Sequence, residues 1–320
     1  SYLSDRVQSV FIDGVESDAH ELIYGVPQGS VLGPILFTLY TSPLGTLIRD
    51  SDISFHLYAD DTQLYIPFSI SESDLAIEKI EHCIEKIRVW MTDNFLKLNE
   101  DKTEVICFGS PNLLAKIKEP LKVKIGSEEI TPAQSVKNIG AFLDSTLSMD
   151  CLINNVCRSA WYHLRNIGKI RPFLNKSTTE KLVHAFVSSK LDYNNGLLYG
   201  VPKQKTDRLQ RVQNAAARIV TKTPKFEHIT PTLVALHWLP IGQRIKYKIL
   251  LLAFKCLVGE APIYMMDLIS QISHERSLRS NSRLLAVPKC RRMYGHRCFK
   301  TATPSLFNPV SYTHLRAHET

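Results

Sequence analysis

Two adjacent acidic residues offer the clearest chemistry in the sequence. Asp60 and Asp61 stand within ISFHLYADDTQLYI, residues 53–66, a pattern that predicts two short strands meeting at the acidic pair. Neighbouring carboxylates repel each other, so a bound cation stabilises them together. Mg²⁺, or Mn²⁺ in its place, suits the pair because it prefers hard oxygen ligands and leaves positions for waters and substrate phosphates. The alternative is a turn whose aspartates are simply solvated.

A loop rich in glycine and proline lies upstream of the acidic pair. Residues 24–30 read YGVPQGS and open into an apolar run at 31–39, which predicts a helix with Pro34 in its first turn. Residues 6–24 alternate loosely around a turn-like Asp-Gly step and predict a hairpin or two edge strands. Isoleucines at helical spacing predict an amphipathic helix over residues 72–95.

The periodicity changes along the chain. Strand-like segments at 103–108, 121–125 and 136–143 give way to helical patterns at 151–170, 177–190, 203–221 and 241–258. We therefore expect a mixed α/β part and a helical part, with a domain boundary near residue 150. A chain of 320 residues with 44 % hydrophobic content is not disordered, collagen-like or coiled coil.

Charge is divided in the same way. Residues 1–110 hold 7 Lys and Arg against 18 Asp and Glu, whereas the remainder holds 32 against 13. Nucleic acid is the commonest polyanion that such a basic part binds, and an anionic membrane surface is the rival partner. On a helix over 203–222, four cations fall within an arc of about 80°. They are Arg208, Arg211, Arg218 and Lys222. This stripe predicts contact with a phosphate backbone, and its alternative is a solvated helix face.

Cysteine usage indicates the cellular compartment. The seven cysteines show no CxxC pair and no disulfide-like rhythm, which favours a reducing environment. With no signal peptide and no apolar run of about 20 residues, we expect an intracellular protein of the cytoplasm and nucleus that does not enter a membrane. Cys290, His296 and Cys298 lack a fourth ligand and a usual zinc spacing, so we do not expect zinc there. We expect Tyr193, Tyr199, Trp161 and Trp238 to pack in the core or between helices and not to stack on bases.

The acidic pair and the upstream loop together resemble the palm of reverse transcriptases, specifically those of LINE-type non-LTR retrotransposons. GVPQGSVLGP at 25–34 is similar to the family's motif B, and YADD at 58–61 is similar to motif C. FLKLNEDKTEVICFG at 95–109 resembles the next motif, D, and VKNIGAFLDSTLS at 136–148 resembles the primer-grip hairpin. Helical stretches at 208–221 and 228–262 extend the resemblance to about residue 308.

The resemblance implies an α+β fold. A partial polymerase palm, an antiparallel sheet with helices on one face, would be followed by a mostly helical thumb and C-terminal region. The expected domains are a palm at 1–110 with motifs B, C and D, a primer-grip-like hairpin region at 111–150, a basic thumb-like region at 151–225 and a helical C-terminal region at 226–308. Residues 309–320 resemble translated adapter sequence, and we exclude them from the functional argument.

The implied activity is RNA-directed DNA polymerisation by two-metal nucleotidyl transfer, with Mg²⁺ or Mn²⁺ as cofactor. Its partners would be an RNA template, a DNA primer and deoxynucleoside triphosphates. By resemblance, Asp60 and Asp61 bind metal, and Lys102 lies near the departing pyrophosphate. The nucleotide and template would contact Gln28, Gly29 and Ser30. The alternatives are a solvated lysine and a loop whose glycines only turn the chain into a helix.

The sequence also departs from the family's pattern. A further metal-binding aspartate, from a motif A upstream of motif B, has no counterpart, because Asp5, Asp13 and Asp18 lie outside an apolar strand context. We therefore expect an N-terminally truncated polymerase fragment that is inactive alone, since a half-built electrostatic site loses most of its rate enhancement. The alternatives are a non-catalytic nucleic-acid-binding remnant and an untranslated fossil element.

Overall fold

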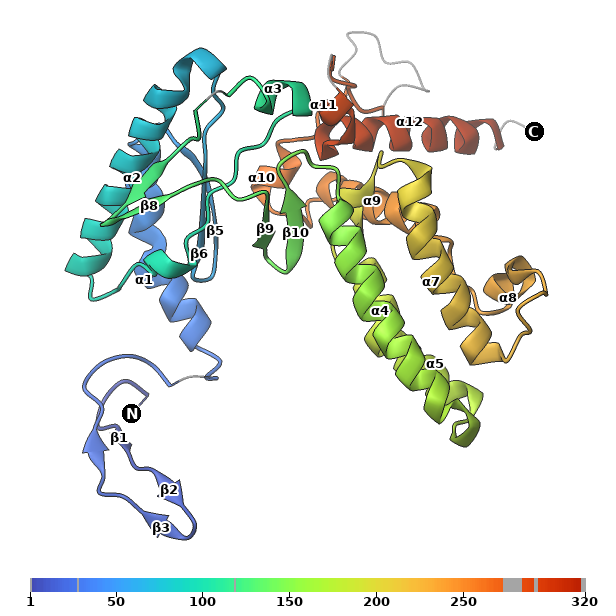
Figure 1. Ribbon diagram of the computed structural model, residues 1–320, viewed down its shortest axis with the longest axis horizontal. Coiled ribbons are helices and arrows are strands. Elements are labelled where there is room, and N and C mark those ends of the chain that lie inside the picture. Colours follow the sequence, from blue (N-terminus) through green and yellow to red (C-terminus); the bar gives the residue numbers. More distant parts are fainter. Residues whose placement is uncertain (1, 28, 118, 273–283, 291–292, 318–320) are drawn as a thin grey trace. The chain divides into compact units, whose positions relative to one another are not determined.

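A computed structural model describes residues 2–27, 29–117, 119–272, 284–290 and 293–317 (Figure 1). The chain divides into two compact units, Ser1–Ala133 and Gln134–Thr320. Each unit has its own cluster of buried apolar side chains. Helices combine with antiparallel strand pairs in the described residues, which confirms the expected α+β class.

Unit 1 begins with an arm of short paired strands. Strand β1 (Val7–Gln8) pairs with β4 (His20–Glu21), and β2 (Phe11–Ile12) pairs with β3 (Val15–Glu16). Asp13 and Gly14 form the turn between β2 and β3 with φ of 50° and 84°, a left-handed geometry that matches the twist of a two-residue hairpin. The hairpin predicted over 6–24 is therefore confirmed. Every residue from 7 to 27 is exposed, so the arm adds nothing to the core of unit 1.

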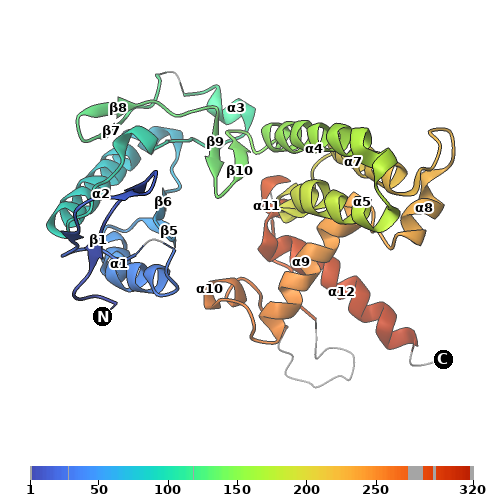
Figure 2. The same cartoon turned by 90° about the horizontal axis from the view of Figure 1, so that it is seen from below.

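The core of unit 1 lies between two helices and a second hairpin. Helix α1 (Gly33–Arg49) and helix α2 (Ser73–Asp93) pack with the hairpin of β5 (Ser54–Tyr58) and β6 (Asp61–Tyr65), as Figures 1 and 2 show. Phe55 and Leu64 are register partners, and both pack against this core, so the helices cover one face of the hairpin. The core residues are Leu44, Ile48, Ile53, Cys83 and Ile87.

The rest of unit 1 is irregular apart from short elements. These are η1 (Ile70–Glu72), η2 (Glu100–Lys102), α3 (Pro111–Leu114), β7 (Val123–Ile125) and β8 (Glu128–Ile130). The strand expected at 103–108 is wrong, because this segment has no strand partner along its length. The Val105 carbonyl accepts a hydrogen bond of 2.8 Å from the Ala133 N–H, whereas the Thr103 N–H only closes the preceding turn on the Glu100 carbonyl. An apolar run becomes a strand where a neighbour can satisfy its backbone groups.

Unit 2 is a helical assembly preceded by the hairpin of β9 (Ser135–Asn138) and β10 (Ala141–Asp144). Its first helices are α4 (Asp150–Ile170), η3 (Arg171–Phe173), α5 (Lys176–Val183), the π-helical turn η4 (His184–Ser188), α6 (Ser189–Asp192) and η5 (Asn195–Leu198). Next come α7 (Lys203–Thr221), α8 (Ile229–Ala235), α9 (Ile241–Leu257), α10 (Ile263–Met266), α11 (Met293–Arg297) and α12 (Phe299–Ala317). The predicted helices at 151–170, 203–221 and 241–258 are confirmed.

The core of unit 2 is larger than that of unit 1. Apolar stripes of α4 and α7 face each other and are joined by residues of the α5–α6 segment, α8 and α9. Fully buried examples are Ile153 and Leu164 on α4, Leu209 and Val212 on α7, and Ile241 on α9. The helical spacing of these residues is what allowed the helices to be predicted from the sequence.

The division between the units falls at 133/134 and not near 150. Ala141 of β10 is buried in the core of unit 2, and Asp144 accepts hydrogen bonds from the backbone N–H groups of Ser148 and Met149 just before α4. The hairpin is thereby tied to the helices that follow it. The boundary expected near residue 150 follows the change from strands to helices, and it therefore separates the β9–β10 hairpin from the helices on which it packs. Among the described residues, no helix is long and apolar enough to cross a membrane.

Candidate active site

The acidic pair lies at the tip of the β5–β6 hairpin. Tyr58 pairs with Asp61, which leaves Ala59 and Asp60 as a two-residue turn, as the sequence predicts. Ala59 has φ of 53°, so an L-residue here adopts the left-handed region that tight turns require. Both aspartates are exposed. Within the described part of the chain, neither carboxylate has a hydrogen-bonding or ion-pair partner, so both are free to bind a cation.

The loop before α1 contains two glycines in the left-handed backbone region. Gly25 and Gly29 have φ of 79° and 80°, and a Cβ built on either meets no atom within 4 Å, which leaves their backbone open to a ligand. Ser30 is engaged by the fold. Its Oγ accepts a hydrogen bond from the Gly33 N–H at 3.2 Å and lies 2.5 Å from the Tyr2 hydroxyl. Gln28 lies outside the described residues.

The hairpin tip and the start of α1 lie toward the same end of unit 1. Strand β5 packs beside α1 and runs back along it, so the turn at Ala59–Asp60 points toward the N-terminal half of the helix (Figure 1). The two predicted site segments therefore share one end of this unit. No hydrogen bond or ion pair connects them among the residues that the structure describes.

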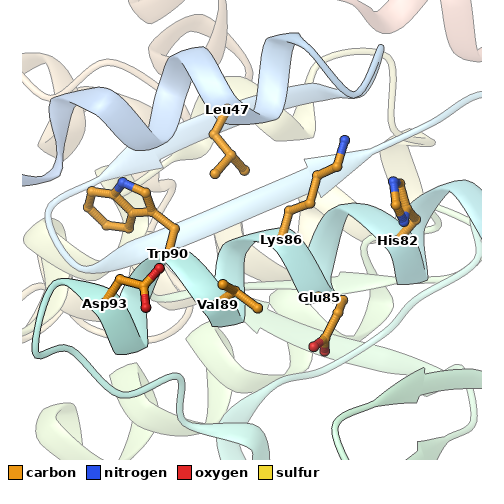
Figure 3. Close-up of a pocket in the computed structure, with 7 residues that line it drawn as sticks. All are labelled: Leu47, His82, Glu85, Lys86, Val89, Trp90 and Asp93. Atoms are coloured by element: carbon orange, nitrogen blue, oxygen red, sulfur yellow. The ribbon is translucent and has the colours of Figure 1, made fainter.

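Lys102 does not line the surface pocket between α1 and α2. Lys102 ends the short helix η2 and is exposed. Figure 3 shows a surface pocket of about 350 Å³ between α1 and α2, where Leu47 faces the side chain of Trp90. The other lining residues are His82, Glu85, Lys86, Val89 and Asp93. None of the residues predicted to bind metal or nucleotide lines this pocket.

The hairpin tip supplies fewer carboxylate ligands than a two-metal centre needs. Asp60 and Asp61 offer carboxylate oxygens that suit one Mg²⁺ or Mn²⁺ ion with waters and substrate completing its shell. A two-metal centre holds ions about 4 Å apart and requires further protein carboxylates. In the described parts of the chain, no three His, Cys, Asp or Glu side chains gather into a group that could hold a metal ion. These residues therefore fit part of such a centre and not all of it.

Two of the four predicted backbone-binding cations are used within the fold. Arg208 donates a hydrogen bond of 2.7 Å to Asn154 Oδ1, which ties α7 to α4. Arg218 donates to the carbonyls of Pro224 and Glu227, with 2.8 Å to the latter, and so holds the loop after α7. Both arginines are half-buried. They carry structural contacts in addition to charge.

The other two cations are exposed but do not form one stripe. Arg211 lies on the outer face of α7. Lys222 follows the last residue of the helix with φ of 60°, so its side chain departs from the 100° helical rotation that places it beside the arginines. The predicted helix ends correctly at 221, but the predicted stripe extended the helical rotation one residue further, to Lys222, which occupies a left-handed position that glycine or asparagine usually takes.

Comparisons with known proteins agree with the motifs. Residues 2–143 match the family model described as reverse transcriptase (RNA-dependent DNA polymerase). Probable RNA-directed DNA polymerase from transposon BS of Drosophila melanogaster is 27 % identical over 237 residues, which are 71 % of this chain and 25 % of that protein. RNA-directed DNA polymerase from mobile element jockey, also of Drosophila melanogaster, is 27 % identical over 162 residues, 49 % of this chain and 17 % of that protein.

The chain thus spans about a quarter or less of the length of these curated relatives. No solved structure matches it. The matched region of 2–143 contains the glycine loop, the acidic hairpin and Lys102, the segments that resemble the family's motifs. Residues 2–143 therefore match the reverse transcriptases, an enzyme family of RNA-directed DNA polymerases, and the chain is similar to RNA-directed DNA polymerases of Drosophila mobile elements.

Proposed function

We propose that this chain supplies the motif B and motif C portion of an RNA-directed DNA polymerase encoded by a non-LTR retrotransposon. The observation that carries the proposal is the pair of exposed, unpartnered carboxylates of Asp60 and Asp61 on a tight hairpin turn. The turn points toward the end of unit 1 where α1 begins (Figure 1). The partners would be an RNA template, a DNA primer and deoxynucleoside triphosphates.

Each group has a role that its environment supports. Asp60 and Asp61 would hold a divalent cation, whose chemistry in this family is to neutralise charge on the primer oxygen and the leaving phosphates. Gly29 would let the backbone approach the nucleotide, because no neighbouring side chain covers it. Lys102 is exposed and can reach a phosphate as a point charge. Seven free cysteines support a reducing compartment, the cytoplasm or the nucleus, as the place of action.

We further propose that the chain does not extend a primer alone, because the described residues assemble two carboxylates where a two-metal centre needs more. A primer-extension assay with an RNA template, a DNA primer and Mg²⁺ tests this. We expect no template-directed product above background. Robust synthesis that Asp60→Asn abolishes would contradict the proposed inactivity and would support the catalytic role of the pair.

Metal binding by the pair is tested separately. Electron paramagnetic resonance can count the Mn²⁺ bound by the chain, and we expect D60N/D61N to remove one weak site. The matched control is D13N/D18N, which removes two exposed aspartates of the arm. If both double variants bind Mn²⁺ as the parent does, the acidic pair is a solvated turn and its proposed role is wrong.

A further inference from the structure

The outer face of α4 carries a line of cations without partners. Arg158, Arg165 and Lys169 follow one another at intervals of seven and four residues, which places them on one side of the helix. Leu152, Ile153, Cys157, Ala160, Leu164 and Ile167 line the opposite, buried side. All three cations are exposed. In the part of the chain that the structure describes, none of them forms a hydrogen bond or an ion pair with its side chain.

Two large aromatic side chains flank this line. Trp161 is 44 % exposed on one side of the cations and Tyr162 is 62 % exposed on the other. The sequence favoured core or helix packing for Trp161, Tyr193, Tyr199 and Trp238. Trp238 is buried as expected, whereas Trp161 and Tyr193 are exposed. Exposed aromatic rings beside cations are available to stack on a partner. We call Arg158, Trp161, Tyr162, Arg165 and Lys169 together the α4 face.

An aromatic side chain of α4 contacts a further aromatic ring on the π-helical turn η4. The Tyr162 ring meets His163 edge-on with ring centres 5.3 Å apart, and His163 stacks on Phe186 at 5.2 Å. Phe186 belongs to the π-helical turn η4, and it is 45 % exposed. Single π-helical turns within helices often mark functional sites, because the extra residue redirects a side chain. Here η4 interrupts the helical segment at the residue that reaches His163.

Few acidic side chains lie close to the α4 face along the chain. Residues 150–192 hold seven Lys and Arg but three Asp and Glu. Each of the three acids lies beside a basic side chain elsewhere. The pairs are Asp150 with Lys205 at 2.7 Å, Glu180 with His184 at 3.7 Å, and Asp192 with Arg244 at 2.5 Å. No ion pair in the described part of the chain involves Arg158, Arg165 or Lys169, so their positive charge is available to attract a polyanion.

Other arginines of unit 2 differ from these three because their side chains donate hydrogen bonds within the fold. Arg171 donates hydrogen bonds to the carbonyls of Ile219 and Val220 at 2.7 and 3.0 Å and so caps the end of α7. Arg208 is held by Asn154, one turn before Arg158, which places its guanidinium at the N-terminal end of the α4 face. The free cations on α4 have no such structural task.

We propose that the α4 face binds single-stranded nucleic acid, with Arg158, Arg165 and Lys169 on phosphates and Trp161 and Tyr162 stacking on bases. From Arg158 to Lys169 the helix rises roughly 16 Å. About five nucleotides of a stacked strand cover that length at 3.4 Å each. Unpaired bases stack on exposed rings, whereas a duplex hides its base faces. The inference rests on the proposed function for a strand to be present, but it concerns a site outside residues 2–143 and needs no catalysis.

The test measures binding of a labelled 15-nucleotide single-stranded RNA by fluorescence anisotropy over a range of KCl concentrations. For R158Q/R165Q/K169Q we expect weaker binding and a salt slope reduced by about 2, at roughly 0.7 per lost phosphate contact. The matched control is K203Q/K225Q/K255Q, which removes three exposed lysines from other surfaces of unit 2. Equal effects of both triple variants would show nonspecific attraction to net charge and would overturn the proposal.

The aromatic residues decide between a single strand and a duplex. We expect Tyr162→Ala to weaken single-strand binding by roughly tenfold, within the range for one lost stacking contact. Tyr162→Phe should retain the affinity, and a duplex of the same sequence should be unaffected by Tyr162→Ala. If the duplex binds more tightly and depends equally on the three cations, the face is a duplex site and the proposal is wrong.

Two further measurements separate this site from a membrane-binding surface and from the acidic pair. Vesicles containing phosphatidylserine test the membrane alternative, and binding to them that requires the three cations, without RNA binding, would overturn the proposal. Asp60→Asn should leave RNA binding unchanged, so failure of polymerisation and failure of this site are distinguishable. Because the substituted side chains are exposed, we expect every variant to keep the parent's circular dichroism spectrum and melting temperature.

Discussion

Asp144 joins the β9–β10 hairpin to α4, and replacing it should destabilise unit 2. The residue is 8 % exposed at the end of β10. One carboxylate oxygen accepts hydrogen bonds from the Ser148 N–H at 2.7 Å and the Thr146 hydroxyl at 2.8 Å. The other accepts from the Met149 N–H at 2.8 Å. Together these bonds hold the turn that leads into the first helix of the unit.

The cost of a substitution follows from these donors. Asparagine keeps one carbonyl oxygen but places an amide group against one of the backbone N–H groups, so we expect Asp144→Asn to cost about 2 kcal/mol in the free energy of unfolding. Alanine leaves every donor without its acceptor, and we expect a loss of about 4 kcal/mol. Asp267→Asn is the control, because Asp267 is exposed, and it should change stability by less than about 0.5 kcal/mol.

The same carboxylate predicts a pH dependence. Burial raises the pKa of Asp144, but the hydrogen bonds from Ser148, Thr146 and Met149 outweigh it and hold the pKa below its ordinary value. A folded-state pKa below the unfolded value of about 3.9 means that the stabilisation is fully present above that value. It is lost as the pH falls through the folded pKa. The stability difference between the parent and Asp144→Asn should therefore be constant above about pH 5 and shrink toward pH 3.

Urea unfolding followed by circular dichroism, repeated from pH 3 to pH 7, measures both effects. An Asp144→Asn variant as stable as the parent at pH 7 would refute the assigned hydrogen bonds. A stability difference that does not change down to pH 3 would refute the assigned ionisation. Asp150 also has a lowered pKa, through its hydrogen bond from Lys205, so the variant should keep some acid sensitivity.

Three shorter predictions follow from other sites. Arg171→Lys should cost about 2 kcal/mol in thermal unfolding, nearly as much as Arg171→Ala, because a single ammonium cannot reproduce the planar fork that caps α7. Near-parent stability of the lysine variant would contradict this. Ala59→Gly should stabilise unit 1 by about 0.5–1 kcal/mol in urea, since glycine adopts the left-handed turn without strain, and a destabilised variant would show that φ is wrong. A thiol reagent at pH 8 should modify exposed Cys298 quickly and spare Cys83, whose pKa is raised by burial, and equal rates by mass spectrometry would refute that burial.

Local patterns were sufficient to predict several parts of this protein from its sequence. The turn at Ala59–Asp60 follows from two alternating segments around an acidic pair, and α2, α4, α7 and α9 follow from apolar spacing. These features depend on neighbours within a few residues along the chain. The motif resemblance worked for the same reason, because a short run such as YADD carries its own chemistry.

Tertiary structure decided what the patterns left open. The segment at 103–108 has a strand's composition, but a strand requires a partner that the sequence does not place beside it. Four cations on one helical arc look equivalent in the sequence, yet Arg208 is bound by Asn154 of another helix, Arg218 by carbonyls of the loop after its own helix, and Arg211 is exposed. The cations on α4 have no ion-pair partner in the described residues, because the acids near them in the sequence lie beside His184, Lys205 and Arg244. Spacing along one helix determines which side chains share a face, whereas the availability of a charge depends on groups that folding brings to it from remote positions.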